Sequence, residues 1–395
     1  MRILLGVTGS IAAYKIVNLA SMLVKIKADV HVVMTRNACQ FITPTTFETL
    51  TGHKCLVDTF DRDHEFHVQH VSLAQQVDLI LIAPASANVI ARLAHGICDD
   101  MLTTTVLASS APKLVAPAMN TGMWRNPILQ DNLAKLRHYG FDVIQPATGR
   151  LACGDVGEGK MPSEEVLLQH ILLHVGHEHD WQGRRVLISA GPTREAIDPV
   201  RYITNHSSGK MGYALARAAA MRGAEVTLVS GPVEQKPFCG VERVPVVSAA
   251  DMYQEMTQRS ADADVIIMCS AVADYTPVHC AEHKMHKGEG DMALPLTRTQ
   301  DILQYLGDHK REGQVLVGFS METDDLLARS RAKLARKHAD LICANPLVEG
   351  QTGFGVDTNR VSLITADQVV DLPLCSKDET AQLILDYVQE HWLQA

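Results

Sequence analysis

The chain has 395 residues, of which 46% are hydrophobic and 21% charged, and its formal net charge is −9. This composition is typical of a globular protein, and the length predicts two or more domains. The negative charge argues against a nucleic-acid partner, which would need a basic face. No run reaches the roughly 18 apolar residues that span a bilayer, so no membrane segment is expected. The nine cysteines are scattered singly, without a CxxC pair, which predicts reduced thiols and a cytoplasmic location.

The first half of the chain alternates short apolar runs with amphipathic stretches, a pattern that predicts right-handed βαβ units and a parallel sheet covered on both faces. Helices are expected at about 10–25 and from about residue 163. The expected strands are 2–7, 29–34, 77–83, 113–116 and 142–145.

A polar connector at 176–183 separates this half from a second series of the same type. Its helix is expected at about 210–221, and a hairpin at 360–365 and 369–374. The expected strands are 185–190, 225–230, 265–270, 315–319 and 340–344. The predicted fold class is α/β, with two tandem doubly wound parallel-sheet domains. The first is flavodoxin- or Rossmann-like at residues 1–178, and the second is Rossmann-like and binds a nucleotide at 184–395.

The end of the first strand is a candidate anion site. Gly9 permits a tight turn, and Ser10 with the following amides opens a helix, where an anion is favoured. The turn is not GxGxxG, so a mononucleotide phosphate fits better than a dinucleotide. An ordinary strand–glycine–helix turn explains the same residues equally well.

Two later strands end in the sequences PASAN, at 84–88, and PAMNTGMW, at 117–124. Both place small residues and a side-chain amide where a flat ring could lie, although two proline-led loops are the simpler reading. The pair resembles the signature of the homo-oligomeric flavin-containing cysteine decarboxylases. With HVSLAQQVDLILIAPASAN before it and LACGDVGEGKM after it, the resemblance over residues 1–175 is to phosphopantothenoylcysteine decarboxylase.

The resemblance implies that bound FMN oxidises the substrate thiol to a thioaldehyde, which loses CO₂ to give an enethiolate that is then reduced and protonated. It gives His70 a role in removing substrate protons, Asn120 a hold on the substrate carboxylate, and Cys153 the role of proton donor. The glycine-rich segment 149–159 around Cys153 could cover the flavin as a lid. The residues implied to bind FMN are Gly9, Ser10, Ile11, Thr35, Ser86, Ala87 and Asn88. Met123 is implied to bind the substrate.

Two simpler interpretations stand beside these roles. His64, His67 and His70 recur every third residue, which could indicate a metal site, but no nearby Cys or His completes the ligand set. Cys153 taken alone could be a structural thiol, although its flanking glycines leave little for it to pack against.

In the second half, SSGKMG opens a helix and could cradle a phosphate, but it lacks the first glycine of a Walker A loop. The block GPTREAIDPVRYITNHSSGKMG, with similarity continuing to about residue 365, resembles phosphopantothenate–cysteine ligase. In the bacterial enzymes CTP activates the carboxylate as an acyl-cytidylate, and the amine of cysteine displaces CMP. Mg²⁺ and lysines would neutralise the triphosphate.

The resemblance implies that Asn205 holds the acyl intermediate, that Arg201 lies beside it, and that Lys284 is catalytic. The family's KxKK run reads Lys-Met-His-Lys here, with His286 in its third place, so one phosphate contact is expected to be weaker or pH-dependent. Spacing alone would place Lys333 and Lys337 on a solvated helix face. The residues implied to contact CTP are Met268, Cys269, Ser270, Asp274, Lys284, Gln300, Asp301, Ile302, Leu303, Phe319, Lys333 and Lys337.

The order of the two resemblances is that of the fused bacterial enzymes of coenzyme A biosynthesis. It implies a homo-oligomer of up to twelve subunits, a dodecamer built from trimers of the first half and dimers of the second. Three alternatives remain: a prenyl-flavin synthase-like flavoprotein, a non-catalytic regulatory subunit, and a second half that only binds a nucleotide.

Overall fold

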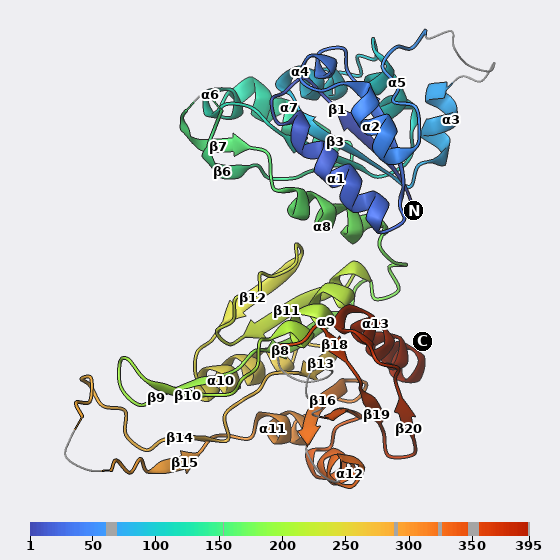
Figure 1. Cartoon of the computed structure of the whole chain (residues 1–395). Helices are drawn as coiled ribbons and strands as arrows, with labels where there is room; N and C mark the ends of the chain where they lie inside the picture. The colour runs from blue at the N-terminus through green and yellow to red at the C-terminus, as the bar shows by residue number, and fades with distance from the viewer. Residues whose placement is uncertain (61–68, 153, 288–290, 323–325, 347–354, 394–395) are drawn as a thin grey trace. The chain divides into compact units, whose positions relative to one another are not determined.

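A computed structural model describes residues 1–60, 69–152, 154–287, 291–322, 326–346 and 355–393 (Figure 1). The chain forms two compact units, Met1–His177 and Glu178–Ala395. Each unit is built around its own parallel sheet.

The first unit contains a five-stranded sheet in the order β2-β1-β3-β4-β5, with every pair parallel. Its strands are β1 Arg2–Val7, β2 Asp29–Met34, β3 Leu79–Ala85, β4 Lys113–Pro117 and β5 Phe141–Val143. This is the flavodoxin-like order, and the direction of winding reverses between β1 and β3.

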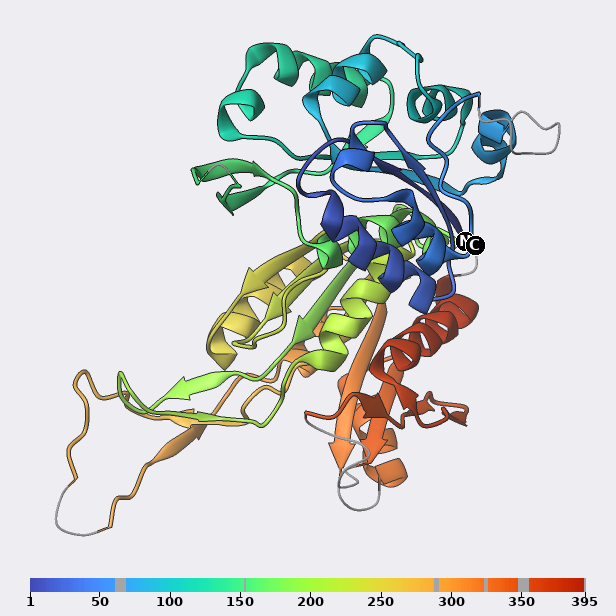
Figure 2. The ribbon, with the colours of Figure 1, turned by 45° about the horizontal axis from the view of Figure 1, so that its top comes forward.

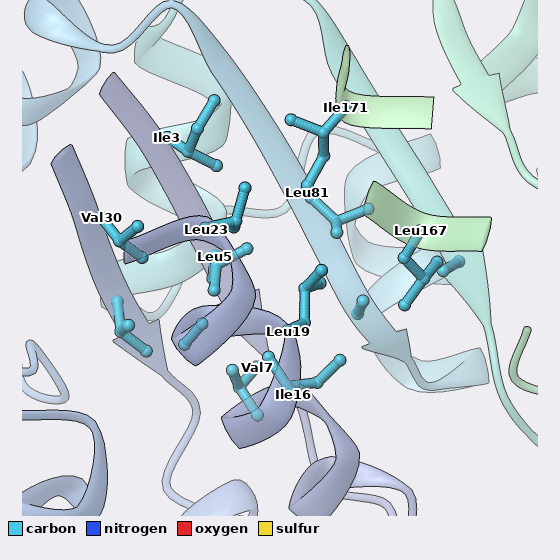
Figure 3. Close-up of a cluster of buried hydrophobic side chains, with 14 of the residues drawn as sticks. Ile3, Leu5, Val7, Ile16, Leu19, Leu23, Val30, Leu81, Leu167 and Ile171 are labelled. Atoms are coloured by element: carbon cyan, nitrogen blue, oxygen red, sulfur yellow. The ribbon is translucent and has the colours of Figure 1, made fainter. Parts of the chain in front are cut away.

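Helices cover both faces of this sheet because its strands are apolar on both sides. On one face Ile3, Leu5 and Leu81 pack against Leu19 of α1 and Leu167 of α8 (Figure 3). On the other face the side chains of β3 pack against α4, α5 and α7. The helices are α1 Ala13–Lys25, η1 Ala38–Gln40, α2 Pro44–Thr51, α3 Gln69–Gln76, α4 Ala87–Ala94, α5 Met101–Ala108, α6 Thr121–Trp124, α7 Pro127–His138 and α8 Glu164–Val175.

An antiparallel hairpin of β6 Ala147–Arg150 and β7 Val156–Lys160 stands apart from the sheet. From the sequence we expected a loop here that could cover the flavin as a lid, and no strands. Its residues are mostly glycine and polar, so they lack the alternating apolar pattern by which a strand is recognised.

The second unit has an eight-stranded sheet in the order β12-β11-β8-β13-β16-β17-β19-β20. The first six strands are parallel in the Rossmann order, and the antiparallel hairpin β19–β20 follows at one edge, as the sequence predicted. The strands are β8 Arg185–Ala190, β11 Glu225–Ser230, β12 Val241–Pro245, β13 Val265–Met268, β16 Val315–Glu322, β17 Leu341–Pro346, β19 Ser362–Ile364 and β20 Val369–Asp371.

The helices of this unit also lie on two faces. The core on one face includes Met252 of α10, Leu306 of α11 and Leu334 of α12, while α9 packs on β8 and α13 on α9. The predicted α/β class with two doubly wound sheets is therefore confirmed. The helices are α9 Lys210–Met221, α10 Ala249–Ser260, α11 Ile302–Asp308, α12 Leu326–Lys337, α13 Lys377–Val388 and η2 Gln389–Leu393.

Two short strand pairs, together called the arm below, extend from the loops after β8 and β13 (Figure 2). They are β9 Arg194–Ala196 with β10 Tyr202–Thr204, and β14 Tyr275–Pro277 with β15 Leu296–Arg298. A third small pair joins β18 Thr358–Asn359 to β21 Cys375–Ser376. Among the described residues no helix combines the length and apolarity needed to cross a bilayer.

Candidate active sites

In the first unit, the loops after β1 and β3 are joined at the point where the winding reverses. The buried Thr8 hydroxyl donates a hydrogen bond to Pro84 O at 2.6 Å and accepts one from Ser86 N at 2.9 Å. Ligands of open α/β sheets bind beyond the carboxyl ends of the strands at such a switch point. Thr8 therefore fixes the two loops expected to hold the cofactor. No role was assigned to this residue from the sequence.

The polar side chains predicted around this cofactor sit at the starts of helices. Ser86 Oγ accepts a hydrogen bond from Val89 N at 3.4 Å and caps α4, while Ser10 Oγ accepts one from Ala12 N at 3.3 Å. Asn120 Oδ1 accepts one from Met123 N at 2.8 Å and caps α6. This cap leaves the Asn120 amide donors without a partner among the described residues, as a side chain that binds a carboxylate requires.

Close packing and exposed apolar groups shape the same edge of the sheet. A Cβ on Gly9 would lie 2.7 Å from Asn37 Cβ, so the loops after β1 and β2 approach each other only because residue 9 is glycine. Thr35 Oγ1 accepts a hydrogen bond from Ala38 N at 3.2 Å in that second loop. Ile11 and Met123 are 57% and 48% exposed, an arrangement that suits contact with an aromatic ring.

The hairpin β6–β7 is docked on the loop that carries Asn120. Met119 N donates to Gly159 O at 3.0 Å, and Thr121 Oγ1 donates to Glu158 O at 2.9 Å. A Cβ at Gly159 would collide with Met119 O, so the contact requires glycine. Cys153 comes between β6 and β7 in the sequence and lies outside the described residues.

The remaining predicted member of this site is His70. Its backbone belongs to α3, but its side chain lies outside the described structure. His64 and His67 also lie outside it, so the metal alternative based on this histidine repeat stays untested.

In the second unit a cavity of about 840 Å³ opens at the carboxyl ends of β8, β13 and β16. It is lined by eleven of the twelve residues predicted to contact CTP, and Lys284 is the one that does not line it. Six cationic side chains and two carboxylates line the cavity, although the whole chain is acidic. The charged lining residues are Lys210, Arg298, Lys333, Arg336, Lys337 and Lys377, with Asp274 and Asp301.

The helix α12 is more than a solvated basic face. Lys333 Nζ donates to Phe319 O at 2.7 Å, and the buried Lys337 forms an ion pair with Asp301, which also caps α11. Burial raises the pKa of Asp301. The ion pair with Lys337 and the hydrogen bond from Gln304 N–H lower this pKa by more than burial raises it, so it lies below its usual value. Two helices therefore meet at one charge pair beside the cavity.

Asn205 and Arg201 do not line this cavity, but they lie on the arm beside it. Asn205 Nδ2 donates to Ala271 O at 3.0 Å and to Val272 O at 3.3 Å, and these two acceptors do line the cavity. Arg201 Nη2 donates to Met285 O at 3.2 Å, next to the predicted Lys284.

Sequence reasoning missed Asp198 and Lys377. The side chain of Asp198 is buried and accepts hydrogen bonds from three backbone N–H groups. Lys377 donates to Val356 O at 2.6 Å and to Thr358 O at 3.0 Å, and its pKa is lowered by burial and by Lys210. The signal for Asp198 was its place in the DPVR turn, whereas Lys377 carried none.

Comparison with protein families matches residues 1–176 to the family described as flavoprotein and residues 181–391 to the DNA/pantothenate metabolism flavoprotein C-terminal domain. The coenzyme A biosynthesis bifunctional protein CoaBC of Bacillus subtilis (strain 168) is 46% identical over 98% of this chain and 96% of that protein. The protein of the same name from Vibrio parahaemolyticus is 45% identical over 98% of both chains. A cysteine/cysteine sulfinic acid decarboxylase from an unknown prokaryotic organism is 42% identical over 87% of this chain and 98% of its own length. The chain belongs to the family of bifunctional coenzyme A biosynthesis flavoproteins.

Proposed function

We propose that residues 184–395 form a CTP-dependent phosphopantothenate–cysteine ligase and residues 1–178 an FMN-dependent phosphopantothenoylcysteine decarboxylase. The observation that carries the proposal is the cavity of the second unit, which unites eleven of twelve residues named from the ligase resemblance. The near full-length similarity to coenzyme A biosynthesis proteins supports both activities in one chain.

In the ligase, the six cations of the cavity bind the triphosphate of CTP and stabilise the charge that develops on the departing pyrophosphate. Mg²⁺ would add to this neutralisation of charge, since Mg²⁺ sites commonly combine one or two protein carboxylates with substrate phosphates and waters. Asn205 and Arg201, on the arm beside the cavity, orient the activated acyl group. The amine of cysteine then attacks that group and CMP leaves.

In the decarboxylase, the loops after β1, β2 and β3 would hold FMN, because their amides, small residues and exposed apolar side chains fit a phosphate and a flat ring. When bound, FMN supplies the two-electron acceptor and donor that the loss of CO₂ requires. Asn120 holds the substrate carboxylate through its free amide donors. His70 helps to remove substrate protons, and Cys153 protonates the product of decarboxylation.

Two further parts of the proposal concern assembly and location. The chain forms a homo-oligomer, up to a dodecamer, in which flavin sites are completed between subunits. Its location is the cytoplasm, as the sequence predicts from cysteines that are scattered singly without a CxxC pair.

The cysteine/cysteine sulfinic acid decarboxylase relative motivates a second candidate for the first unit. That unit would then decarboxylate a free amino acid and leave phosphopantothenoylcysteine untouched. An assay that supplies both substrates to the purified chain distinguishes the two candidates.

The test supplies each half with its own substrate. Pyrophosphate release by the purified chain should require CTP, phosphopantothenate and cysteine together, and release without cysteine at the same steady rate would contradict ligation. CO₂ release should follow added phosphopantothenoylcysteine but not free cysteine or cysteine sulfinate. Cys153→Ser should accumulate an oxidised, decarboxylated intermediate detectable by mass, and accumulation of uncleaved substrate would contradict its role as the proton donor.

A further inference from the structure

Asp29, His31 and His53 converge at the edge of the first sheet, and no part of the proposed chemistry uses them. His53 Nε2 lies 2.7 Å from Asp29 Oδ1, and His31 Nε2 lies 3.3 Å from the same oxygen. One ligand atom from each residue lies within 4.8 Å of the other two. Among the described residues this is the one group of three or more such side chains that could hold a metal ion.

The fold brings the three side chains together for separate reasons. Asp29 and His31 lie two positions apart on β2, so both point to the same face of the strand. The helix α2 ends at Gly52 with φ 73°, a left-handed residue that turns the chain and brings back His53. The rings of His31 and His53 stack with centroids 4.2 Å apart and 18° between their planes, and both Nε2 atoms lie within 3.3 Å of Asp29 Oδ1.

The carboxylate is held so that one oxygen is reserved for the histidines. Arg2 Nε donates to Asp29 Oδ2 at 2.6 Å, and Arg2 is itself fixed by Nη1 donating to Gln76 Oε1 at 2.7 Å. Asp29 Oδ1 therefore faces the two imidazoles. Arg2 therefore positions the Asp29 carboxylate independently of the two histidines.

A hydrogen-bonded cluster without metal does not account for all three groups. His53 Nε2 makes a hydrogen bond to Asp29 Oδ1, but His31 Nε2 is buried and makes none within the described part of the chain, despite its 3.3 Å separation.

The ligand types and spacing match zinc. Two imidazoles and one carboxylate, with water in the fourth position, form a common Zn²⁺ set. Ligands at about 2.05 Å from a tetrahedral ion lie about 3.3 Å from one another. The His31–Asp29 separation already has this value, and the His53–Asp29 separation needs to open by only about 0.6 Å.

We propose that Asp29, His31 and His53 bind one Zn²⁺ ion, which clips the loop after α2 to the edge of the sheet. Asp29 opens β2, whereas the proposed flavin loops follow the carboxyl ends of the strands, roughly 16 Å further along at the rise of a strand. The site is thus remote from the proposed flavin chemistry, and the proposal does not depend on the decarboxylase activity.

The test is a Zn²⁺ titration of the FMN-loaded full chain against a chelating indicator. The wild type should bind one equivalent more than His53→Gln, His31→Gln and Asp29→Asn. His309→Gln is the matched control, because His309 is also exposed and stacked, on Tyr305 at 4.0 Å, but belongs to no such group. Equal stoichiometry in the wild type and all three variants would overturn the proposal.

Two further readouts separate a built site from misfolding or from zinc bound by cysteine. Zn²⁺ should raise the thermal midpoint of the first unit in the wild type and in His309→Gln, but not in His53→Gln. Without metal, His53→Gln and the wild type should have the same thermal midpoint. Co²⁺ in the same site should give a tetrahedral spectrum without a thiolate charge-transfer band. A thiolate band that persists in the three variants would assign the bound metal to cysteine and overturn the proposal.

Discussion

Asp198 accepts a hydrogen bond at 3.1 Å from the backbone N–H of Met285, which lies 87 residues further along the chain. Its other oxygen accepts the N–H groups of Val200 and Arg201, both at 2.8 Å. Burial raises the pKa of Asp198, but these hydrogen bonds and the charge of Arg201 outweigh that effect and hold it below its usual value. One ionised side chain therefore joins the arm that carries Arg201 to the segment that carries Lys284.

Replacing Asp198 should impair ligation and leave decarboxylation intact. In Asp198→Asn the remaining oxygen can still accept the turn amides, but the new NH₂ group faces the Met285 N–H, so the link to the Lys284 segment breaks. Asp198→Ala loses both. We expect kcat/KM for pyrophosphate release to fall on the order of tenfold in Asp198→Asn and further in Asp198→Ala.

The two halves of the enzyme provide the control for this prediction. CO₂ release from phosphopantothenoylcysteine should be the same in both variants as in the wild type. If Asp198→Asn ligates at the wild-type rate, the contact with Met285 does not position Lys284.

Gly159 should be essential for docking the hairpin that carries Cys153. Its φ of 112° disfavours any side chain, and a Cβ would collide with Met119 O. Gly159→Ala should shift the hairpin from the Asn120 loop, and a displacement of about 1 Å can reduce turnover on the order of a hundredfold. The measurement is the rate of CO₂ release at saturating substrate.

Gly140→Ala separates backbone strain from this collision. Gly140 has φ 82°, and a Cβ added there would meet no atom within 4 Å, so alanine should cost only about 1 kcal/mol of stability. It should retain decarboxylase activity. A similar loss of activity in both variants would attribute the effect to strain and not to the hairpin contact.

The pair of Asp301 and Lys337 should make the second unit sensitive to acid. The pKa of Asp301 in the folded protein lies below its usual 3.8, so its carboxylate contributes fully to the free energy of unfolding above about pH 3.8. This contribution is lost as the pH falls through the pKa of the folded protein. Asp301→Asn should thus be less stable than wild type at pH 7, and the gap should narrow below about pH 4.

Urea unfolding at several pH values, followed by the fluorescence of the buried Trp181, measures this gap. Asp262→Asn is the control, since Asp262 is 84% exposed and lies 3.8 Å from Arg185. A gap between wild type and Asp301→Asn that stays constant from pH 7 to pH 3 would rule out the lowered pKa as its cause.

The regular sheets were predictable because buried parallel strands are continuous apolar runs. Arg2–Val7 and Glu225–Ser230 have the bounds expected from the sequence. The arm and the β6–β7 hairpin were not predictable, because strands of three to five residues are too short to carry a periodic signal.

The sites show the same limit. The motifs identified the loops that follow the strands as the candidate sites, because the carboxyl ends of parallel strands lie at one edge of the sheet. They could not show that Lys284 lies off the cavity while Lys377, from α13, lines it. Nor could they show that Thr8 joins two flavin loops, since that depends on a hydroxyl meeting a carbonyl 76 residues away.

The most direct test of the central claim is one reaction containing the purified chain with FMN, phosphopantothenate, cysteine, CTP and Mg²⁺, with products identified by mass. The account predicts 4′-phosphopantetheine, with one CO₂ and one pyrophosphate for each molecule formed. Accumulation of phosphopantothenoylcysteine with no CO₂ would contradict the decarboxylase assignment, and unchanged phosphopantothenate would contradict the ligase.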